Sequence, residues 1–136
     1  ITLSSEREQL LETGGGIAIA LPLLGSAPFF AANSDTLCID GNTPALKRLA
    51  AAWQDAEMDV LLLLHPRESA IGYDGKGDFF MDAGGRLSRR GNADSAPYVF
   101  TGVQLLHPRL FAQCPAGPFS MNLLYDRDLS RVRGLL

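Results

Sequence analysis

The stretch MDVLLLLH, residues 58–65, decides the fold class of this sequence. It holds five consecutive apolar residues and is followed at once by Pro66, which ends it. An apolar run of this length favours a strand that is buried on both faces. Strands of that kind are typical of sheets covered by helices on both sides, so we predict an α/β fold.

Strand-like stretches recur on either side of this run. Residues 28–33 (PFFAAN) predict a short buried strand, and residues 98–106 (YVFTGVQLL) predict a longer one. Residues 78–82 and 86–89 flank a pair of glycines and predict a hairpin. Residues 1–3 read as the end of a further strand. With helical stretches between the strands, this order predicts a Rossmann-like mixed sheet flanked by helices.

Four helical stretches are predicted between and after these strands. Residues 13–24 read as a tight glycine turn that leads into a short buried helix. Thr43 and Pro44 offer an N-cap and a first helical residue. Residues 108–111 predict one helical turn, and residues 119–131 predict an amphipathic helix. In the second and fourth of these helices, some apolar side chains are expected to face the protein core. They are Leu46, Leu49, Ala50, Trp53, Met121, Leu124 and Leu129.

The composition is that of an ordinary globular protein. The 136 residues carry a formal net charge of −3, and 46% of them are apolar. This acidic balance gives no sign of a nucleic-acid-binding surface, so any phosphate binding must be local. The two cysteines lack metal-ligand spacing, no apolar run is long enough to cross a bilayer, and no signal peptide is evident. We therefore expect a cytoplasmic protein with reduced thiols.

The first candidate site is the glycine triplet in LETGGGI, residues 11–17. Three residues without Cβ atoms allow a ligand to approach the backbone, and N–H groups at a helix start favour acceptor atoms. Glu12 and Thr13 add polar side chains just before the triplet. The stretch matches neither a Walker loop nor a dinucleotide-binding fingerprint. A flexible turn or a plain helix start is the alternative interpretation.

The second candidate is Asp35, at the end of FFAANSD, residues 29–35. Ligands in open α/β sheets bind at the carboxyl ends of strands. A carboxylate in that place can hold Mg²⁺ against phosphate oxygens, because Mg²⁺ takes few carboxylates and keeps several waters. The alternative is that Asp35 caps the turn or helix that follows.

The third and fourth candidates are GKGDF, residues 75–79, and FTGV, residues 100–103. Lys76 lies between two glycines, where it could meet a phosphate or a sugar, although the loop could equally be the approach to a hairpin. Gly102 lies in the middle of a predicted strand, which it weakens unless something approaches the backbone closely. A simple bulge would explain the same glycine.

Taken in order, these motifs resemble the sugar-1-phosphate nucleotidyltransferase family. The set consists of a glycine-rich turn, a strand that ends in Asn-x-Asp, a long buried strand, a Gly-Asp-Phe loop, a hairpin and a glycine-bearing strand. The forms LETGGGI, GDF and FTGVQLLHPRLF are most similar to those of the bacterial N-acetylmuramate-1-phosphate uridylyltransferases. The resemblance covers nearly all of the chain.

The resemblance implies a glycosyltransferase-A type fold and a site that binds Mg²⁺, a nucleoside triphosphate (UTP in the most similar branch) and a sugar 1-phosphate. It implies that the sugar phosphate attacks the α-phosphorus and releases pyrophosphate. Asp35 would be the catalytic metal ligand. The residues implied to bind the nucleotide are Glu12, Thr13, Gly14, Gly15 and Asn33, and those on the sugar-phosphate side are Gly77, Asp78, Thr101 and Gly102.

The chain also departs from the family pattern. It lacks the glycine-rich loop with an arginine and a Pro-Lys pair that binds the triphosphate, and the Trp-x-Asp-Val-Gly-Thr segment with the second metal-binding aspartate. Ser34 replaces the glycine usual in Asn-x-Asp. We therefore expect residues 1–136 to be the central and C-terminal part of a single nucleotidyltransferase domain, inactive alone. Its exposed sheet edges could pair with a second copy. Guanylyl or thymidylyl transfer, or a non-catalytic nucleotide-sugar-binding role, are the alternatives.

Overall fold

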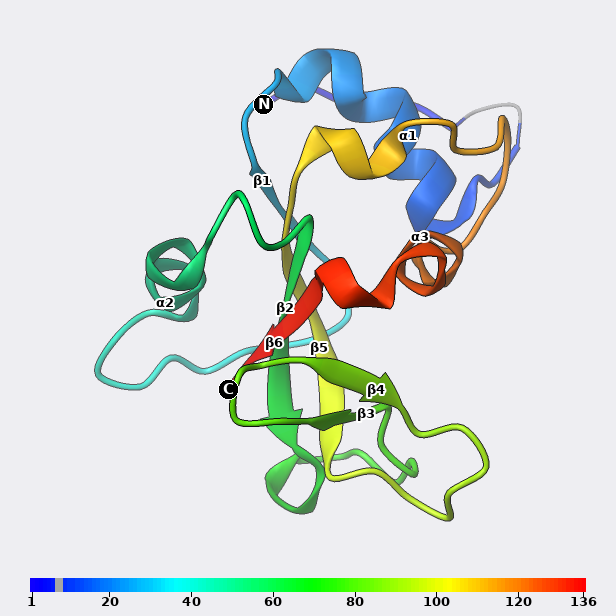
Figure 1. The fold of residues 1–136 in the computed structure, drawn as a ribbon. Coiled ribbons are helices and arrows are strands. Elements are labelled where there is room, and N and C mark those ends of the chain that lie inside the picture. Colours follow the sequence, from blue (N-terminus) through cyan, green and yellow to red (C-terminus); the bar gives the residue numbers. More distant parts are fainter. Residues whose placement is uncertain (7–8) are drawn as a thin grey trace.

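The computed structural model describes residues 1–6 and 9–136. Figure 1 shows the helices and strands in the order in which the chain forms them. The α-helices are α1 (Glu12–Leu24), α2 (Ala45–Ala52) and α3 (Met121–Arg127), and the 3₁₀ turns are η1 (Arg67–Ser69), η2 (Pro108–Phe111) and η3 (Leu129–Arg131). The strands are β1 (Phe29–Ala32), β2 (Val60–Pro66), β3 (Phe79–Met81), β4 (Leu87–Arg89), β5 (Tyr98–Leu106) and β6 (Val132–Leu135).

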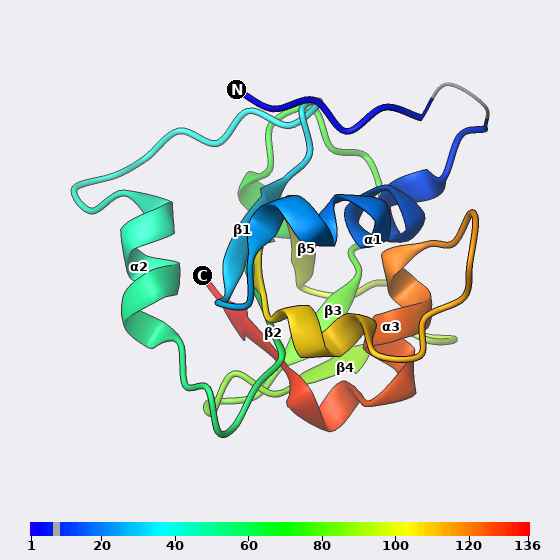
Figure 2. The same cartoon turned by 90° about the horizontal axis from the view of Figure 1, so that it is seen from above.

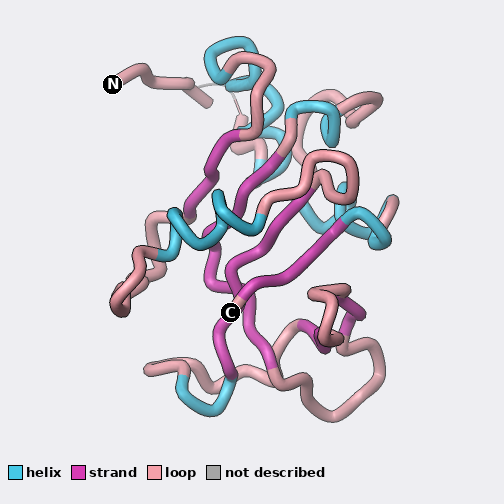
Figure 3. The backbone as a smooth tube through the Cα atoms, turned by 60° about the vertical axis from the view of Figure 1, so that its left-hand side comes forward, coloured by secondary structure: helices cyan, strands magenta, loops and turns pink. Residues whose placement is uncertain are grey.

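The strands form one mixed sheet, drawn in magenta in Figure 3. β5 is its central strand, because it pairs with β1, β2 and β3. The sheet order is β4-β3-β5-β2-β6, and β1 pairs with the C-terminal half of β5. β2 pairs antiparallel to β5 on one side and parallel to β6 on the other. Helices flank this sheet, so the structure confirms the predicted fold class.

The long apolar strand β2 supplies side chains to two separate cores. Val60, Leu62 and Leu64 belong to the larger cluster, which α1, η2 and α3 cover. Leu61 and Leu63 belong to a second cluster, on the side of α2. Figure 2 shows α2 on one side of the strands and α1 with α3 on the other. The expectation of a strand buried on both faces is therefore confirmed.

The C-terminal part differs from the predicted single helix over residues 119–131. α3 ends at Arg127, and the carboxylate of Asp128 accepts a hydrogen bond from the backbone N–H of Ser130 at 3.2 Å, which starts the short turn η3. The chain then enters β6, which pairs in parallel with β2. Four residues, VRGL, are too few to show a strand period in sequence, and only the pairing with β2 makes them a strand.

Four further local predictions were wrong. Residues 1–3 form no strand, and β1 alternates between half-buried and exposed residues instead of being fully buried. The first backbone N–H of α2 donates to the carboxylate of Asp40 at 2.7 Å, so the cap is Asp40 and not Thr43. Leu46 and Ala50 face solvent, because the helix turns Ala45 and Leu49 toward the sheet.

Both cysteines are free thiols, as expected. Within residues 1–6 and 9–136, none of the helices has the length and apolar character needed to cross a bilayer.

Candidate functional site

The glycine triplet lies inside the first turn of α1 and not in a separate turn before it. The backbone N–H groups of Gly14 and Gly15 both donate to the carbonyl oxygen of Phe119, at 2.9 and 3.2 Å. A Cβ atom at Gly14 would lie 2.5 Å from the Phe119 ring, and one at Gly15 would lie 2.5 Å from the carbonyl oxygen of Gly117. The two glycines therefore allow the segment 117–119 to pack against the helix backbone.

This packing bears on the nucleotide-binding role expected of Gly14 and Gly15. Their N–H groups, which a helix start would otherwise leave without partners, are already satisfied within the chain. The glycines led us to expect a group close to the helix backbone. The groups that approach it are Phe119 and Gly117 of the same chain. Nucleotide binding by the two glycines stays a prediction.

Glu12 begins the helix in an uncommon backbone conformation. Its φ angle is 57°, in the left-handed region that L-residues other than Asn and Asp seldom adopt. Glu12 and Thr13 are both exposed. A strained residue of this kind costs about 1–3 kcal/mol and is common at binding and active sites. Its place at the predicted nucleotide site is therefore consistent with a functional role.

A second group of predicted residues meets where β1 ends. The backbone N–H of Asn33 donates to the carbonyl oxygen of Gly102 at 3.0 Å. A Cβ atom at Gly102 would lie 3.0 to 3.2 Å from the Asn33 side chain, and the φ angle of Gly102 is 82°. Gly102 is therefore required both by its own conformation and by the closeness of Asn33.

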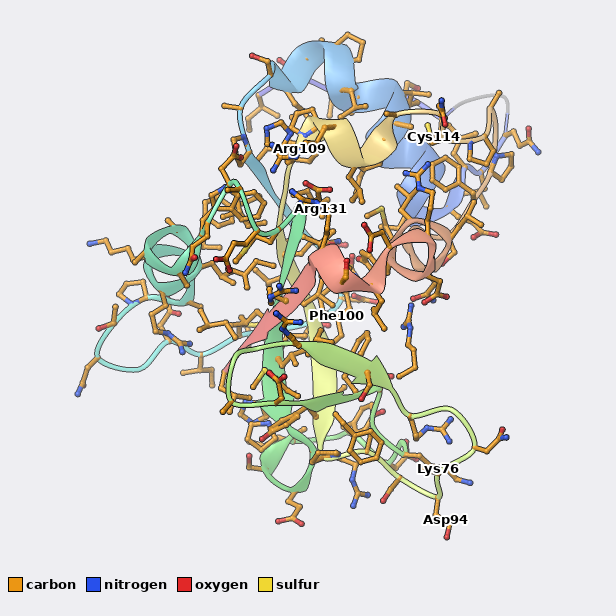
Figure 4. All side chains as sticks on the ribbon, viewed as in Figure 1. Lys76, Asp94, Phe100, Arg109, Cys114 and Arg131 are labelled. Atoms are coloured by element: carbon orange, nitrogen blue, oxygen red, sulfur yellow. The ribbon has the colours of Figure 1, made fainter. Side chains whose placement is uncertain are left out.

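Gly102 belongs to a bulge in the pairing of β2 with β5. Leu62 pairs with Gln104 and Leu64 pairs with Phe100, so three β5 residues lie opposite Leu63 alone. The hydroxyl of Thr101 donates to the carbonyl oxygen of Leu63 at 2.9 Å. Figure 4 labels Phe100, which marks the start of this bulge on β5.

Gly77 and Asp78 lie against the start of the same strand. Gly77 has a φ angle of 79°, and a Cβ atom there would lie 2.1 Å from the carbonyl oxygen of Ala96. The backbone N–H of Asp78 donates to the carbonyl oxygen of Tyr98 at 2.7 Å, and its carboxylate accepts from the N–H of Phe100 at 2.9 Å. The structure thus assembles Asn33, Gly77, Asp78, Thr101 and Gly102 along one strand.

Asp35 lies in an exposed turn two residues after Asn33. The carboxylate that caps α2 is that of Asp40, so Asp35 is not the cap of that helix. In the described parts of the chain, no three His, Cys, Asp or Glu side chains gather in a way that could hold a metal ion. Asp35 is therefore a single accessible carboxylate at the end of β1, which suits an ion that completes its shell with water and phosphate oxygens.

An ion-pair network that no local sequence pattern indicates lies at the other end of the sheet. Asp59 accepts from Arg131 at 2.8 and 2.9 Å and also from the guanidinium of Arg109. Figure 4 labels both arginines, which lie near each other beside the start of β2. Burial raises the pKa of Asp59, but the hydrogen bonds from Arg131 and Arg109 outweigh it, and the pKa is lowered.

A cavity of about 270 Å³ opens beside this network, between η2, α3 and η3. Three arginines line it, but each is already bonded within the chain: Arg109 and Arg131 bind Asp59, and Arg127 donates to the carbonyl oxygens of Leu110 and Ala112. Guanidinium groups committed in this way stabilise the fold, so we do not place the candidate site there.

Comparisons with curated proteins agree on one enzyme. No family model matches the chain. An N-acetylmuramate alpha-1-phosphate uridylyltransferase from Caulobacter vibrioides is 42% identical over 127 residues, which are 93% of this chain and 52% of the relative. An enzyme of the same name from Neisseria meningitidis serogroup B is 31% identical over 117 residues, or 86% of this chain and 48% of the relative.

Solved structures show the same fold at lower identity. HddC from Yersinia pseudotuberculosis, solved in complex with GMP-PN, has a TM-score of 0.72 and 18% identity, and the match covers 94% of this chain and 54% of that one. UDP-glucose pyrophosphorylase in complex with UDP-glucose has a TM-score of 0.62 and 19% identity, with 93% and 53% coverage. The chain spans about half the length of the curated relatives it matches; over that span its sequence is similar to the N-acetylmuramate α-1-phosphate uridylyltransferases and it has the nucleotidyltransferase fold.

Proposed function

We propose that this chain forms the nucleotide- and sugar-facing part of an enzyme that transfers a uridylyl group from UTP to N-acetylmuramate 1-phosphate. The single observation that carries the proposal is the 42% identity over 93% of the chain to an enzyme of that name. A phosphate oxygen of the sugar would form a bond to the α-phosphorus of UTP, and the bond to pyrophosphate would break. Such a product would serve the re-use of cell-wall sugars.

The geometry supports this role because the implied site residues lie on few elements. Asn33 and Asp35 follow β1, while Gly77, Asp78, Thr101 and Gly102 surround the first half of β5. Glu12 and Thr13 lie at the start of α1 with exposed side chains. We assign the α1 and β1 residues to the nucleotide and the surface along the first half of β5, with Gly77 and Gly102, to the sugar phosphate. Catalysis by such a site rests on positioning and on charge neutralisation, and it needs no protein nucleophile.

Asp35 is the residue that would hold Mg²⁺. Its carboxylate is exposed, and it forms no hydrogen bond or ion pair with another residue in the described parts of the chain. Bound Mg²⁺ would neutralise phosphate charge in the transition state. The remaining residues of the site bind the two substrates or hold the residues that bind them in place.

A chimera tests the proposal. The 127 matched residues of the Caulobacter vibrioides relative would be replaced by those of this chain, and pyrophosphate release from UTP and N-acetylmuramate 1-phosphate would be measured. We expect turnover within about tenfold of the parent enzyme, because a tenfold change corresponds to only about 1.4 kcal/mol of transition-state stabilisation. The chain alone should release no pyrophosphate, because it lacks the triphosphate-binding motif of the family.

The choice of substrates decides between the alternatives. Turnover with GTP or dTTP that exceeds turnover with UTP would replace uridylyl transfer by guanylyl or thymidylyl transfer. A folded chimera that binds UDP-N-acetylmuramate but releases no pyrophosphate would favour a non-catalytic nucleotide-sugar-binding domain. Pyrophosphate release by the 136-residue chain alone would contradict the view that it forms only part of the site.

A further inference from the structure

We propose that Thr101 and Asp78 are positioning residues, which hold the β5 bulge so that Gly102 fixes Asn33, and that they do not themselves bind the sugar phosphate. The inference rests on the proposed function in one respect, which is that Asn33 contacts the nucleotide. It concerns how that contact is held in place, and it starts from hydrogen bonds that the two side chains already make within the sheet.

The hydroxyl of Thr101 forms hydrogen bonds within the bulge. Three residues of β5 lie opposite Leu63, so the regular antiparallel pairing of the two strands is interrupted there. At this interruption the Thr101 hydroxyl donates to the carbonyl oxygen of Leu63 at 2.9 Å. The same hydroxyl oxygen accepts from the N–H of Val103 at 3.3 Å. The hydroxyl proton and one of its two lone pairs are therefore used inside the sheet, which leaves it no proton to donate to a phosphate oxygen.

Asp78 forms a comparable hydrogen bond to the backbone of β5, on the side of β5 that faces β3. β3 pairs with β5 through Phe79 and Tyr98, and continuation of that ladder would bring Gly77 opposite Phe100. Gly77 turns away with a φ angle of 79°, so Phe100 loses its ladder partner. A carboxylate oxygen of Asp78 accepts that N–H at 2.9 Å.

Gly102 directly follows Phe100 and Thr101, the two residues that these bonds hold, and it contacts Asn33. Its carbonyl oxygen accepts from the Asn33 N–H at 3.0 Å, and its missing Cβ leaves space for the Asn33 side chain. Bulges often re-aim residues next to active sites. Here the bulge determines where the Asn33–Asp35 turn leaves the sheet, and the two side chains determine the bulge.

Amide hydrogen exchange, followed by NMR on the ¹⁵N-labelled 136-residue chain, tests the inference without any ligand. Thr101→Val keeps the shape of the side chain but removes the hydroxyl, and Thr101→Ser keeps the hydroxyl. We expect Thr101→Val to speed exchange at Asn33 and Val103 about tenfold, the effect of losing one hydrogen bond, relative to the amides of Leu62 and Leu64. Thr101→Ser should stay within about twofold of the wild type.

Thr43→Val is the matched control, because Thr43 is exposed and lies outside the sheet. It should leave exchange at Asn33 unchanged. A Thr101→Val chain that stays folded with wild-type exchange at Asn33 would overturn the inference.

The Asp78 variants decide the matter if Thr101→Val does not fold. Asp78→Asn keeps an acceptor oxygen for the Phe100 N–H, whereas Asp78→Leu does not. We expect Asp78→Leu to speed exchange at Phe100 about tenfold and Asp78→Asn to restore most of the protection. Equal exchange at Phe100 in both variants would overturn the role of Asp78.

Titration with UDP separates this inference from the proposed function. If UDP shifts the Asn33 resonance of the wild type, Thr101→Val should weaken UDP binding and Thr101→Ser should restore it. If UDP shifts no resonance of the wild type, the nucleotide assignment of Asn33 fails, while the exchange results still support or overturn the positioning role.

Discussion

Gly15 and Gly16 are neighbours in the sequence, yet the structure gives them different tasks. A Cβ atom at Gly15 would lie 2.5 Å from a backbone carbonyl oxygen, that of Gly117. At Gly16 the nearest atom, at 2.6 Å, is the end of the flexible Glu6 side chain. The Glu6 carboxylate can move aside, but the backbone of Gly117 cannot. Of these two positions, therefore, only position 15 requires glycine.

This contrast predicts opposite effects of alanine on stability. Gly15→Ala should lower the free energy of unfolding by about 1–3 kcal/mol through overpacking. Gly16→Ala should be neutral or stabilising by up to about 1 kcal/mol, because alanine is the better helix former. Urea unfolding of the two variants measures this. Equal stability of both would mean that segment 117–119 does not pack on α1 as described, and Gly15 would again be free for a ligand.

Asp35 is the residue on which the proposed metal site depends. In the chimera that carries this chain, Asp35→Asn should lower turnover by about two orders of magnitude or more, the scale of losing one key electrostatic group. Stability should change little, because the side chain is exposed and caps no helix. Steady-state rates at saturating Mg²⁺ and a melting curve are the measurements. Near-normal turnover would refute the metal role.

Asp59 makes stability depend on pH in a defined direction. Its pKa is lower in the folded chain than in the unfolded chain, because the hydrogen bonds from two arginines outweigh the effect of burial. The unfolded chain therefore binds the proton more readily, and the contribution of Asp59 is full above the ordinary aspartate pKa of about 3.9 and is lost as the pH falls through the folded value.

Asp59→Asn should therefore destabilise the chain at pH 7, and the difference from the wild type should shrink as the pH falls below about 4. Unfolding free energies measured from pH 7 to pH 3 test this. A difference that stays constant over the range would show that the loss comes from packing and not from the charge on Asp59.

At the scale of elements, β6 shows how a strand can depend wholly on its surroundings. Its four residues gain their conformation by pairing with β2, and the backbone N–H of Gly134 donates to the carbonyl oxygen of Gly85 at 2.8 Å. A Cβ atom at Gly134 would meet Leu64, Met81 and Leu87 at 2.7 to 2.9 Å. A side chain at position 134 would therefore force three packed side chains to shift where β6 joins β2 to the β3–β4 hairpin.

Gly134→Ala should accordingly lower the unfolding free energy by about 1–3 kcal/mol. Gly41→Ala is the matched control, because a Cβ atom there would meet nothing within 4 Å. Thermal unfolding of the two variants measures the difference. If Gly134→Ala melts with the control, the contact between β6 and the hairpin is not as close as described.

At the scale of the whole molecule, many apolar side chains remain on the surface. Ile19 and Leu23 lie one turn apart on α1 and are 46% and 58% exposed. The loop after Asp35 adds Leu37 and Ile39, which are almost fully exposed. Exposed apolar side chains that are neighbours on one helix face, as Ile19 and Leu23 are, can form a contact site between proteins.

We therefore predict that the 136-residue chain self-associates at micromolar concentration. Leu23→Lys should shift the population toward monomer, because it places a charge in the apolar face of α1. Ile71→Lys is the control, since Ile71 is an exposed apolar residue in the loop after η1. Sedimentation velocity over a concentration series measures both. A wild type that stays monomeric throughout would contradict the prediction.

The sequence by itself determined the features that depend on near neighbours in the chain. The run of residues 60–64, the hairpin and the strand over residues 98–106 were all predictable, since apolar period and turn residues are local signals. The similarity to the sugar nucleotidyltransferases was also predictable from the ordered motifs.

Tertiary structure alone decided the rest. β6 is a strand because it pairs with β2. The N–H groups of Gly14 and Gly15 donate to Phe119, and the Thr101 hydroxyl donates to Leu63. These partners are too far apart in the sequence for a local pattern to indicate them. The same holds for Asp59, whose partners Arg109 and Arg131 follow it by 50 and 72 residues. Unpaired backbone groups and buried charges must find partners wherever the fold brings them, and only the folded chain shows which residues those are.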